Sequence, residues 1–341
     1  MHRLRAIVIL FSWSACGGNA ETGPDAATEI DAPVLVDAPA SSSLGTVNGV
    51  TDLATCPMGA PAGATCMQLT VSGCPGIESE ALDAIVAITQ PVGTNRGTIV
   101  HFSGGGGQGF QVSGAAAYAQ AGFRQAFVSW TNDWERTQAK GIKVAGCRPS
   151  TVIRWVFSEP RLHGASRTTG FCGEGFSGGS AQLGYALATY GLADYFDYVN
   201  ELSGPPFARI DLGCDGNAPA TTTVCGATVT MKLPPKLDMW TNAPSNACGA
   251  TTNSPSQVDQ WKTDSIAIGG LYDYPKTRVE FFDCTNNATA VTGMAQLYHD
   301  VITSTKQYHC YAQADGCQGE GLGSGGRDAT TAMIAGCTPR H

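Results

Sequence analysis

Short strand-like runs alternate with helix-like runs from about residue 46 to the end of this chain. The strand-like runs fall at residues 67–71, 81–89, 97–102, 125–130, 168–174, 198–202, 278–283 and 307–312. Helix-like runs lie between them at residues 114–122, 150–157, 182–188, 293–303 and 327–335. This alternation is typical of chains in which helices connect parallel strands. The sequence therefore predicts an α/β fold, with a mostly parallel sheet and helices on both faces.

One segment interrupts the alternation. Residues 205–262 are rich in Pro, Thr and Asn and contain three cysteines. We expect them to form a disulfide-rich, cap-like insertion that covers one end of the sheet. The folded domain is then predicted to span residues 46–341.

The composition indicates a globular domain and excludes some partners. The chain has 341 residues, of which 43% are hydrophobic and 14% charged, enough for a sizeable core. Its formal net charge of −8 provides no basic surface for displacing the counterions of nucleic acid, so no nucleic-acid partner is expected. Beyond the N-terminus, no apolar stretch is long enough to span a membrane.

The N-terminus has the form of an export signal. Two arginines in the first five residues precede a short apolar run at 6–13, and Ser14 and Ala15 lead to Cys16. This arrangement resembles the bacterial lipobox, in which the cysteine is acylated, although Trp13 stands where a leucine-like residue is usual. Residues 17–45 are rich in Ala, Asp and Pro and are predicted to form a disordered tether. The sequence thus predicts a cell-envelope lipoprotein that contacts the membrane only through a lipid anchor at Cys16.

The cysteines are consistent with export. Apart from Cys16, twelve remain, an even number that predicts up to six disulfides in an exported chain. A zinc site is the alternative, but no Cys-x-x-Cys spacing is present. Pairing cannot be deduced from spacing; Cys310 with Cys317 and Cys214 with Cys225 are the plausible local loops.

A single motif carries most of the functional information. Residues 175–180 read Gly-Phe-Ser-Gly-Gly-Ser, between a predicted strand and a predicted helix. Gly-x-Ser-x-Gly in this context forms a tight turn that lifts the serine oxygen clear of the backbone, and larger side chains would collide there. An ordinary glycine-rich turn is the structural alternative, because the chain contains 43 glycines.

The order of strands around this motif resembles that of the α/β-hydrolase superfamily, over roughly residues 65–337. The resemblance implies a serine hydrolase that cleaves an ester or related acyl bond, with Ser177 as the nucleophile and no cofactor. It implies an oxyanion hole formed by the N–H groups of Gly178 and of Gly104 or Gly105. Ser103 stands at the start of this loop, where a histidine is usual.

The resemblance also implies an acid and a histidine. The acid is expected after the strand at 278–283, which points to Asp283, with Asp211 as the second choice. The histidine is expected in the loop after the last strand, but Gln318 stands there, and an amide oxygen is a very weak base. His309 is the least unsuitable of the remaining histidines, and Glu320 is an unusual alternative base.

Two other functions stay open. Without a working histidine, the chain would be a hydrolase-fold protein that binds a ligand or partner in the same cleft. In addition, Gly104, Gly106 and Gly109 form a Gly-x-Gly-x-x-Gly pattern after a strand, which is also found at dinucleotide sites. The pattern follows the third predicted strand rather than the first, which makes this alternative the weaker one. The leading prediction is therefore ester hydrolysis of a small-molecule or polymer substrate.

Overall fold

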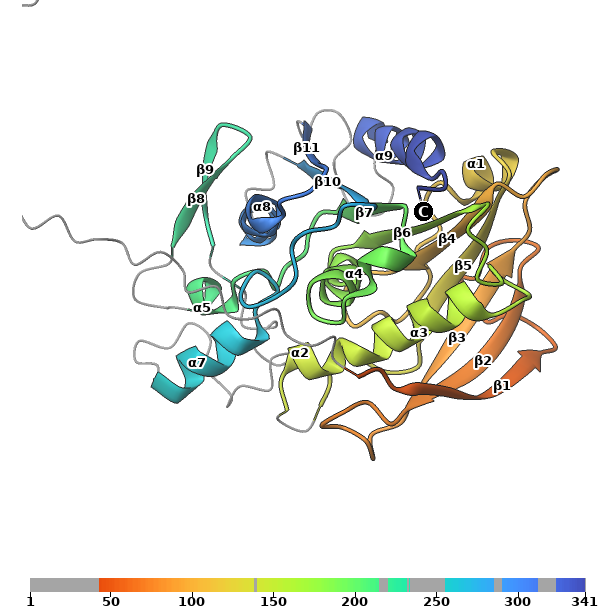
Figure 1. The fold of residues 1–341 in the computed structure, drawn as a ribbon, viewed down its shortest axis with the longest axis horizontal. Helices are drawn as coiled ribbons and strands as arrows, with labels where there is room; N and C mark the ends of the chain where they lie inside the picture. The colour runs from red at the N-terminus through yellow and green to blue at the C-terminus, as the bar shows by residue number, and fades with distance from the viewer. Residues whose placement is uncertain are drawn as a thin grey trace, which may run out of the picture. The chain divides into compact units, whose positions relative to one another are not determined.

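A nine-stranded sheet forms the centre of the computed structural model, which describes residues 43–137, 140–214, 220–231, 233, 255–284, 290–311 and 323–340. The strand order is β1-β2-β3-β5-β4-β6-β7-β10-β11 (Figure 1). The strands are β1 (Thr46–Leu53), β2 (Thr65–Ser72), β3 (Leu82–Thr89), β4 (Gly97–Phe102), β5 (Phe123–Trp130), β6 (Gly170–Phe176), β7 (Tyr198–Leu202), β10 (Arg278–Cys284) and β11 (Lys306–Tyr311). The predicted export signal, Cys16 and nearly all of the tether lie outside the described residues.

The sheet has an antiparallel edge and a parallel body. Pairing is antiparallel from β1 to β2, β3 and β5, and parallel from β5 through β4, β6, β7 and β10 to β11. All residues of β4 and nearly all of β6 are buried, as expected for central strands that are covered on both faces. Since the parallel strands run in one direction, their carboxyl ends meet at one edge of the sheet.

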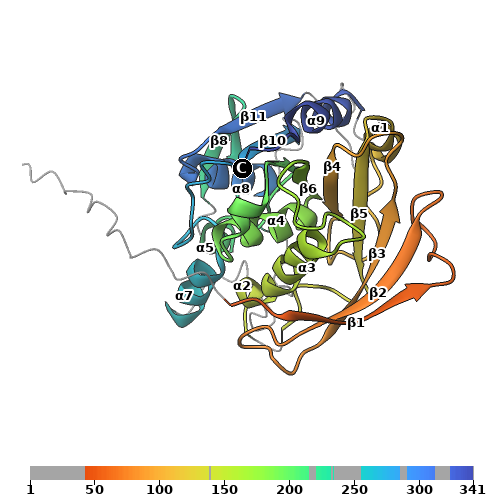
Figure 2. The same ribbon diagram turned by 45° about the vertical axis from the view of Figure 1, so that its right-hand side comes forward.

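Helices cover both faces of the parallel body (Figures 1 and 2). On one face lie α3 (Cys147–Ser158), α4 (Gly178–Ala188) and α8 (Ala290–Val301), whose apolar side chains share the main core with the sheet. On the other face lie α1 (Ala115–Gln120) and α9 (Gly323–Gly336), which pack around Tyr118, Tyr198 and Met333. The shorter elements are α2 (Ile142–Ala145), the 3₁₀ helix η1 (Leu192–Tyr195), α5 (Ile210–Gly213), β8 (Thr221–Val224), β9 (Ala227–Thr230) and α7 (Pro255–Asp264).

The predicted α/β fold is confirmed, and each predicted strand and helix is present within a few residues. β1 and the β8–β9 hairpin were not predicted from the sequence. All eight positions of β1 are at least partly exposed without regular alternation, so its sequence lacks the apolar pattern of a core strand. Between β7 and β10, the described part of the predicted insertion contains α5, the hairpin and α7.

Disulfides join distant parts of the domain. The described pairs are Cys56–Cys66, Cys74–Cys147, Cys172–Cys337 and Cys225–Cys310. Both local pairings suggested by spacing are therefore wrong, because Cys225 pairs with Cys310, 85 residues away. This pair connects the insertion to the sheet by joining the hairpin to β11. Cys214 is also disulfide-bonded.

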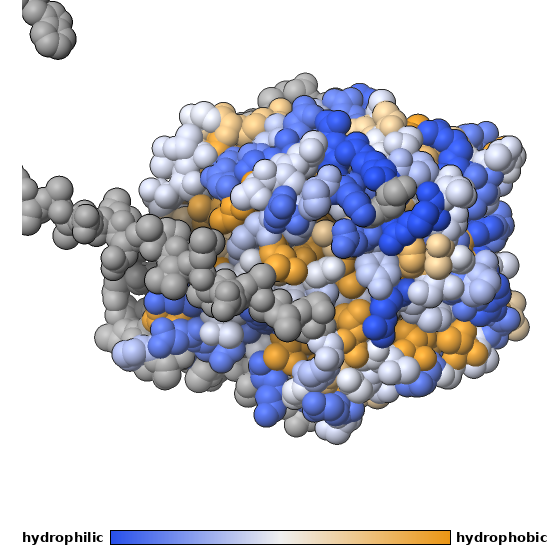
Figure 3. Space-filling view, viewed as in Figure 1, coloured by the Kyte–Doolittle hydropathy of each residue, from blue (hydrophilic) through white to orange (hydrophobic). Residues whose placement is uncertain are grey.

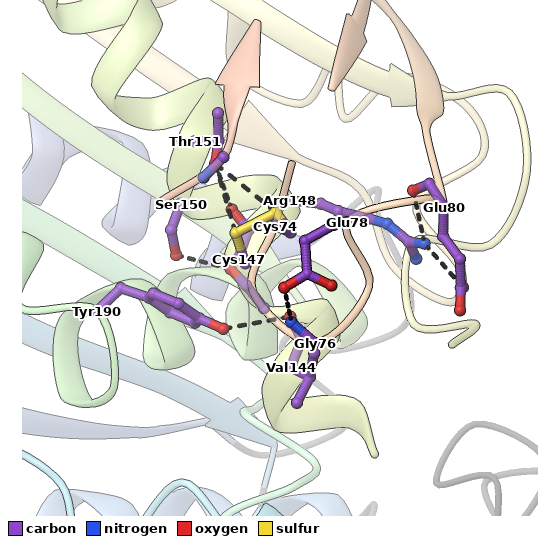
Figure 4. Close-up of a disulfide and its surroundings, with 12 residues drawn as sticks. Cys74, Gly76, Glu78, Glu80, Val144, Cys147, Arg148, Ser150, Thr151 and Tyr190 are labelled. Atoms are coloured by element: carbon purple, nitrogen blue, oxygen red, sulfur yellow. Dashed lines mark hydrogen bonds and ion pairs between the residues drawn. A yellow bond between two sulfur atoms is a disulfide. The ribbon is translucent and has the colours of Figure 1, made fainter. Parts of the chain in front are cut away.

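The Cys74–Cys147 disulfide lies next to a buried arginine (Figure 4). Cys74 follows β2, and Cys147 begins α3. Arg148 is 3% exposed and donates hydrogen bonds to the carbonyl oxygens of Trp134 (2.8 Å) and Arg136 (2.6 Å). It also forms an ion pair with Glu80 at 3.5 Å. The start of α3 thus fixes the loop that follows β5.

Hydrophobic and hydrophilic residues are mixed on the face of the described residues that Figure 3 shows. On the face shown in Figure 3, hydrophobic residues form small groups separated by hydrophilic ones. Among the described residues, none of the helices combines the length and apolar character that crossing a membrane requires.

Loop closure gives a first prediction. Replacing Cys74 and Cys147 together with alanine should lower the free energy of unfolding by about 4 kcal/mol, because this disulfide closes a loop of 73 residues. The matched variant without Cys56 and Cys66, which close a loop of 10 residues, should lose about 3 kcal/mol. Urea unfolding under oxidising conditions measures both values. Equal losses, or a larger loss for the short loop, would contradict the loop-closure account.

Candidate active site

Ser177 lies in a strained turn at the carboxyl end of β6. Its backbone angles are φ 51° and ψ −111°, and α4 begins at the next residue. Its N–H donates to the carbonyl oxygen of Leu202 on β7 at 2.8 Å, which fixes the turn against the neighbouring strand. A non-glycine residue in such a conformation costs about 1–3 kcal/mol, and such residues cluster at functional sites. The glycine-rich motif is therefore a strand-to-helix elbow.

The glycines of the motif permit close backbone contacts. A Cβ atom on Gly175 would lie 2.4 Å from the carbonyl oxygen of Gly179. One on Gly179 would lie 2.1 Å from the carbonyl oxygen of Phe102, at the end of β4. No side chain fits at these distances, so the glycines are required by the packing of the elbow.

The glycine-rich loop after β4 lies directly against the elbow. A Cβ atom on Gly178 would be 2.2 Å from the carbonyl oxygen of Gly105 and 2.9 Å from its nitrogen. Gly104 packs against the ring of Phe176, the residue before Ser177. Within the described structure, the N–H groups of Gly105 and Gly178 donate no hydrogen bond. Two unpaired donors thus lie beside Ser177, as an oxyanion hole requires.

Hydrogen bonds hold this loop in place. The Ser103 hydroxyl donates to the carbonyl oxygen of Gly109 at 2.9 Å, and the Gly109 N–H donates to the Ser129 hydroxyl at 2.8 Å. The Trp134 N–H donates to the carbonyl oxygen of Gly106 at 3.0 Å. Ser103 therefore supports the loop in a position where a histidine is usual in the family that the sequence resembles.

The same contacts disfavour a dinucleotide site. A Cβ atom on Gly106 would meet the Asp133 carboxylate at 2.2 Å, so an anionic group already occupies the space beside this glycine. The loop ends at Gly109, and α1 begins only at Ala115. A pyrophosphate site requires the glycine turn to lead into a helix N-terminus.

Asp283 lies at the carboxyl end of β10 and is 1% exposed. One carboxylate oxygen accepts a hydrogen bond from the Tyr308 hydroxyl at 2.6 Å, and the other has no partner. Burial raises the pKa of Asp283 to about 7. Burial also raises the pKa of Glu201, on β7, well above its usual range, and the Asp283 carboxylate raises it further. Two acids with raised pKa values are thus buried together, next to the strand that carries Ser177.

The second candidate acid has a different partner. Asp211 lies in α5, where its two oxygens accept hydrogen bonds from Arg209 at 2.9 and 2.8 Å. This bidentate pair occupies the carboxylate.

The structure does not bring His309 to Ser177. His309 lies in β11, aligned with Phe282 on β10, Leu202 on β7 and Phe176 on β6. Three strand spacings, about 14 Å, therefore separate it from the strand that carries Ser177. Its Nε2 lies 2.7 Å from a carboxylate oxygen of Glu280, and its ring stacks on Phe282. Proton transfer requires a distance of about 3 Å.

The other described histidines are also remote from Ser177. His101 is fully buried against Phe127 and Glu174, three residues below the elbow on the sheet. His163 contacts Thr98, near the opposite end of β4, and His299 lies in α8 beside Asp300. Gln318 and Glu320 lie outside the described residues, as do His2 and His341. Among the described residues, no imidazole lies beside Ser177, and none of their His, Cys, Asp and Glu side chains form a metal-binding group.

Ser203, which follows β7 directly, was not predicted from the sequence as a site residue. It has φ 48°, and the next residue, Gly204, packs on the elbow. Its position in the sequence could have indicated it as a site residue. Ser203 directly follows one predicted strand, just as Ser177 follows the end of another.

The buried acid gives a second prediction. The raised pKa of Asp283 means that its contribution to stability is complete below about pH 4 and is lost as the pH rises to about 7. Asp283→Asn should remove this loss, since an amide oxygen still accepts the Tyr308 hydrogen bond. Urea unfolding should show that the variant gains stability relative to the wild type from pH 5 to pH 8, by up to about 1.4 kcal/mol per pH unit inside the titration window. A difference independent of pH would contradict the assignment.

Comparison with known proteins supports the fold. No family model matches the sequence, and no curated protein matches it significantly. An acetyl xylan esterase from a Paenibacillus species superimposes with a TM-score of 0.54 and 10% identity, covering 86% of this chain and 89% of that one. An acetyl xylan esterase from a Thermoanaerobacterium species has a TM-score of 0.49 and 11% identity, over 85% and 88% of the two chains. A bacterial heroin esterase has a TM-score of 0.46 and 14% identity, over 81% and 85% of the two chains. Together with the strand order and the elbow, the likeness to the Paenibacillus enzyme shows that this protein has the α/β-hydrolase fold.

Proposed function

We propose that this protein hydrolyses an ester bond through Ser177. One observation carries the proposal: a strained serine lies at the end of a central strand, between the unpaired N–H groups of Gly178 and Gly105. An N–H pair beside a strained serine is suited to the negative charge that develops on a carbonyl oxygen under attack.

The residues support a two-step reaction. The Ser177 oxygen attacks the carbonyl carbon, and the oxyanion is held by the N–H groups of Gly105 and Gly178. Gly178 is the first residue of α4, so its donor also benefits from the positive end of the helix dipole. The alcohol leaves, and water then hydrolyses the acyl-serine.

We expect ester hydrolysis by this protein to be slow. No histidine occurs in the loop where the family places one, and the described histidines are engaged elsewhere. We propose that solvent hydroxide takes the Ser177 proton. Without a general base, an oxyanion hole and substrate binding alone retain about 10³–10⁴-fold acceleration over water.

The substrate and the location are also proposals. An acidic protein without a basic surface suits a neutral small-molecule or polymer ester rather than nucleic acid. The N-terminal sequence supports export and a lipid anchor at Cys16, which would place the enzyme at the cell envelope.

A second candidate is a binding module that uses the same cleft without turnover. It is favoured by the Ser177 hydroxyl, which has no hydrogen-bond acceptor among the described residues. A nucleophile without an acceptor is not activated in the resting protein.

Covalent labelling distinguishes the two candidates. A fluorophosphonate probe should label the protein slowly but to one equivalent, because its phosphoryl oxygen occupies the oxyanion hole while Ser177 attacks phosphorus. Intact-mass spectrometry measures the adduct. Ser177→Ala should remain unlabelled, whereas Ser166→Ala, near the opposite end of the sheet, should react like the wild type. A folded wild-type protein that stays unlabelled would favour the binding module.

The missing imidazole gives a kinetic prediction. The rate of 4-nitrophenyl acetate hydrolysis that depends on Ser177 should rise about tenfold per pH unit between pH 6 and 9, without the plateau near neutrality that a histidine base produces. His309→Gln should change this rate less than about twofold, since its ring is bound to Glu280 on a distant strand. A plateau that disappears in His309→Gln would place His309 in the reaction.

A further inference from the structure

A second strained serine lies beside the first. Among the described residues, four that are not glycine have positive φ angles: Ala165, Ser177, Ser203 and Cys225. Ser177 and Ser203 follow β6 and β7, which are neighbours in the sheet. A turn that only reverses the chain is relieved by glycine at such a position. Two serines kept there side by side indicate a use for their hydroxyl groups.

Backbone contacts fix the two serines in one row. The Ser177 N–H donates to Leu202 on β7 at 2.8 Å, and the Ser203 N–H donates to Phe282 on β10 at 3.0 Å. Each bond continues the sheet by one residue, so adjacent serines are about one strand spacing apart, roughly 5 Å between backbones. A Cβ atom on Gly204 would lie 3.1 Å from the Ser177 carbonyl oxygen, which shows that the loop after β7 touches the elbow.

Both hydroxyl groups remain available. Ser177 and Ser203 are half-buried, whereas Gly178 and Gly204 beside them are buried. Neither hydroxyl makes a hydrogen bond within the part of the chain that the structure describes. The row therefore offers two free hydroxyl groups at the carboxyl edge of the sheet.

The two flanks of Ser177 differ. The glycine loop with Gly105 comes from β4, on one side of β6, and Ser203 follows β7, on the other side. An ester whose carbonyl oxygen points to Gly105 must direct its other two substituents away from the glycine loop. The alkoxy oxygen of the bound ester can then face Ser203.

We propose that Ser203 donates a hydrogen bond to the leaving oxygen of the ester, a role that rests on the proposed function. The Ser177 oxygen bonds to the carbonyl carbon while its proton passes to hydroxide, forming water. The bond from carbon to the alkoxy oxygen then breaks, and the departing oxygen carries negative charge. The Ser203 hydroxyl stabilises this charge until water protonates the alcohol and regenerates hydroxide. Since no described imidazole lies there, we assign assistance of departure to Ser203.

A series of aryl acetates tests the role. Phenyl acetate has a poor leaving group and needs stabilisation, whereas 4-nitrophenolate leaves readily without it. Ser203→Ala should lower kcat/KM for phenyl acetate about tenfold and for 4-nitrophenyl acetate less than about twofold, as expected for one hydrogen bond to a charged oxygen. The dependence of kcat/KM on leaving-group basicity should become steeper.

Ser203→Gly provides a second variant that retains folding. It removes the hydroxyl and also relieves the positive φ, so it should raise the melting temperature by about 2–4 °C. Its kinetics should match those of Ser203→Ala. Ala165→Gly is the matched control, because it relieves a similar φ of 54° in an exposed loop before β6 and should stabilise the protein without changing kinetics.

The outcomes separate the two proposals. Equal losses for both esters, or no loss for either, would overturn the role of Ser203 while leaving Ser177 as the nucleophile. Turnover that is unchanged in Ser177→Ala would overturn the proposed function and this role with it. A selective loss with phenyl acetate in both Ser203 variants supports the inference.

Discussion

The close backbone contact between Gly178 and Gly105 is the constraint on which the site depends. It brings the start of α4 within van der Waals distance of the loop after β4, and no side chain fits between them. The same approach is repeated one residue later, where Gly179 meets Phe102. Glycine is therefore required at positions 178 and 179 by the contact itself, whereas at position 105 it is favoured by a positive φ of 59°.

Support for this contact extends far into the domain. The backbone N–H of Trp134 donates a hydrogen bond to the glycine loop. Arg148, at the start of α3, donates a hydrogen bond to the carbonyl oxygen of Trp134. The Cys74–Cys147 disulfide joins that start of α3 to the antiparallel edge of the sheet. A strained elbow persists only where its surroundings over-determine it, and this chain of contacts supplies such surroundings.

The fold could be predicted from the sequence where a single strand, helix or turn has a recognisable local pattern of residues. The central strands are short runs with several apolar residues, and the elbow is a local motif between two predicted elements, so both were predicted within a few residues. Features that depend on contacts between distant parts of the chain, or that lack a local pattern, could not be predicted in this way. β1 is largely exposed and has no apolar period, and disulfide pairing depends on which distant cysteines the fold brings together. Asp283 was placed correctly at the end of β10, but its burial with Glu201 depends on the pairing of β7 with β10.

The sequence by itself determined the elbow, the glycine loop and the lack of a histidine between residues 312 and 322, because each is a matter of residue type at a short spacing. Only the tertiary structure decided which side chains meet there. Parallel pairing aligns the ends of strands that are far apart in the chain, so Ser203 lies beside Ser177 and His309 lies three strands away. Lateral order in a sheet is set by how whole elements pack, and no local run of residues encodes it.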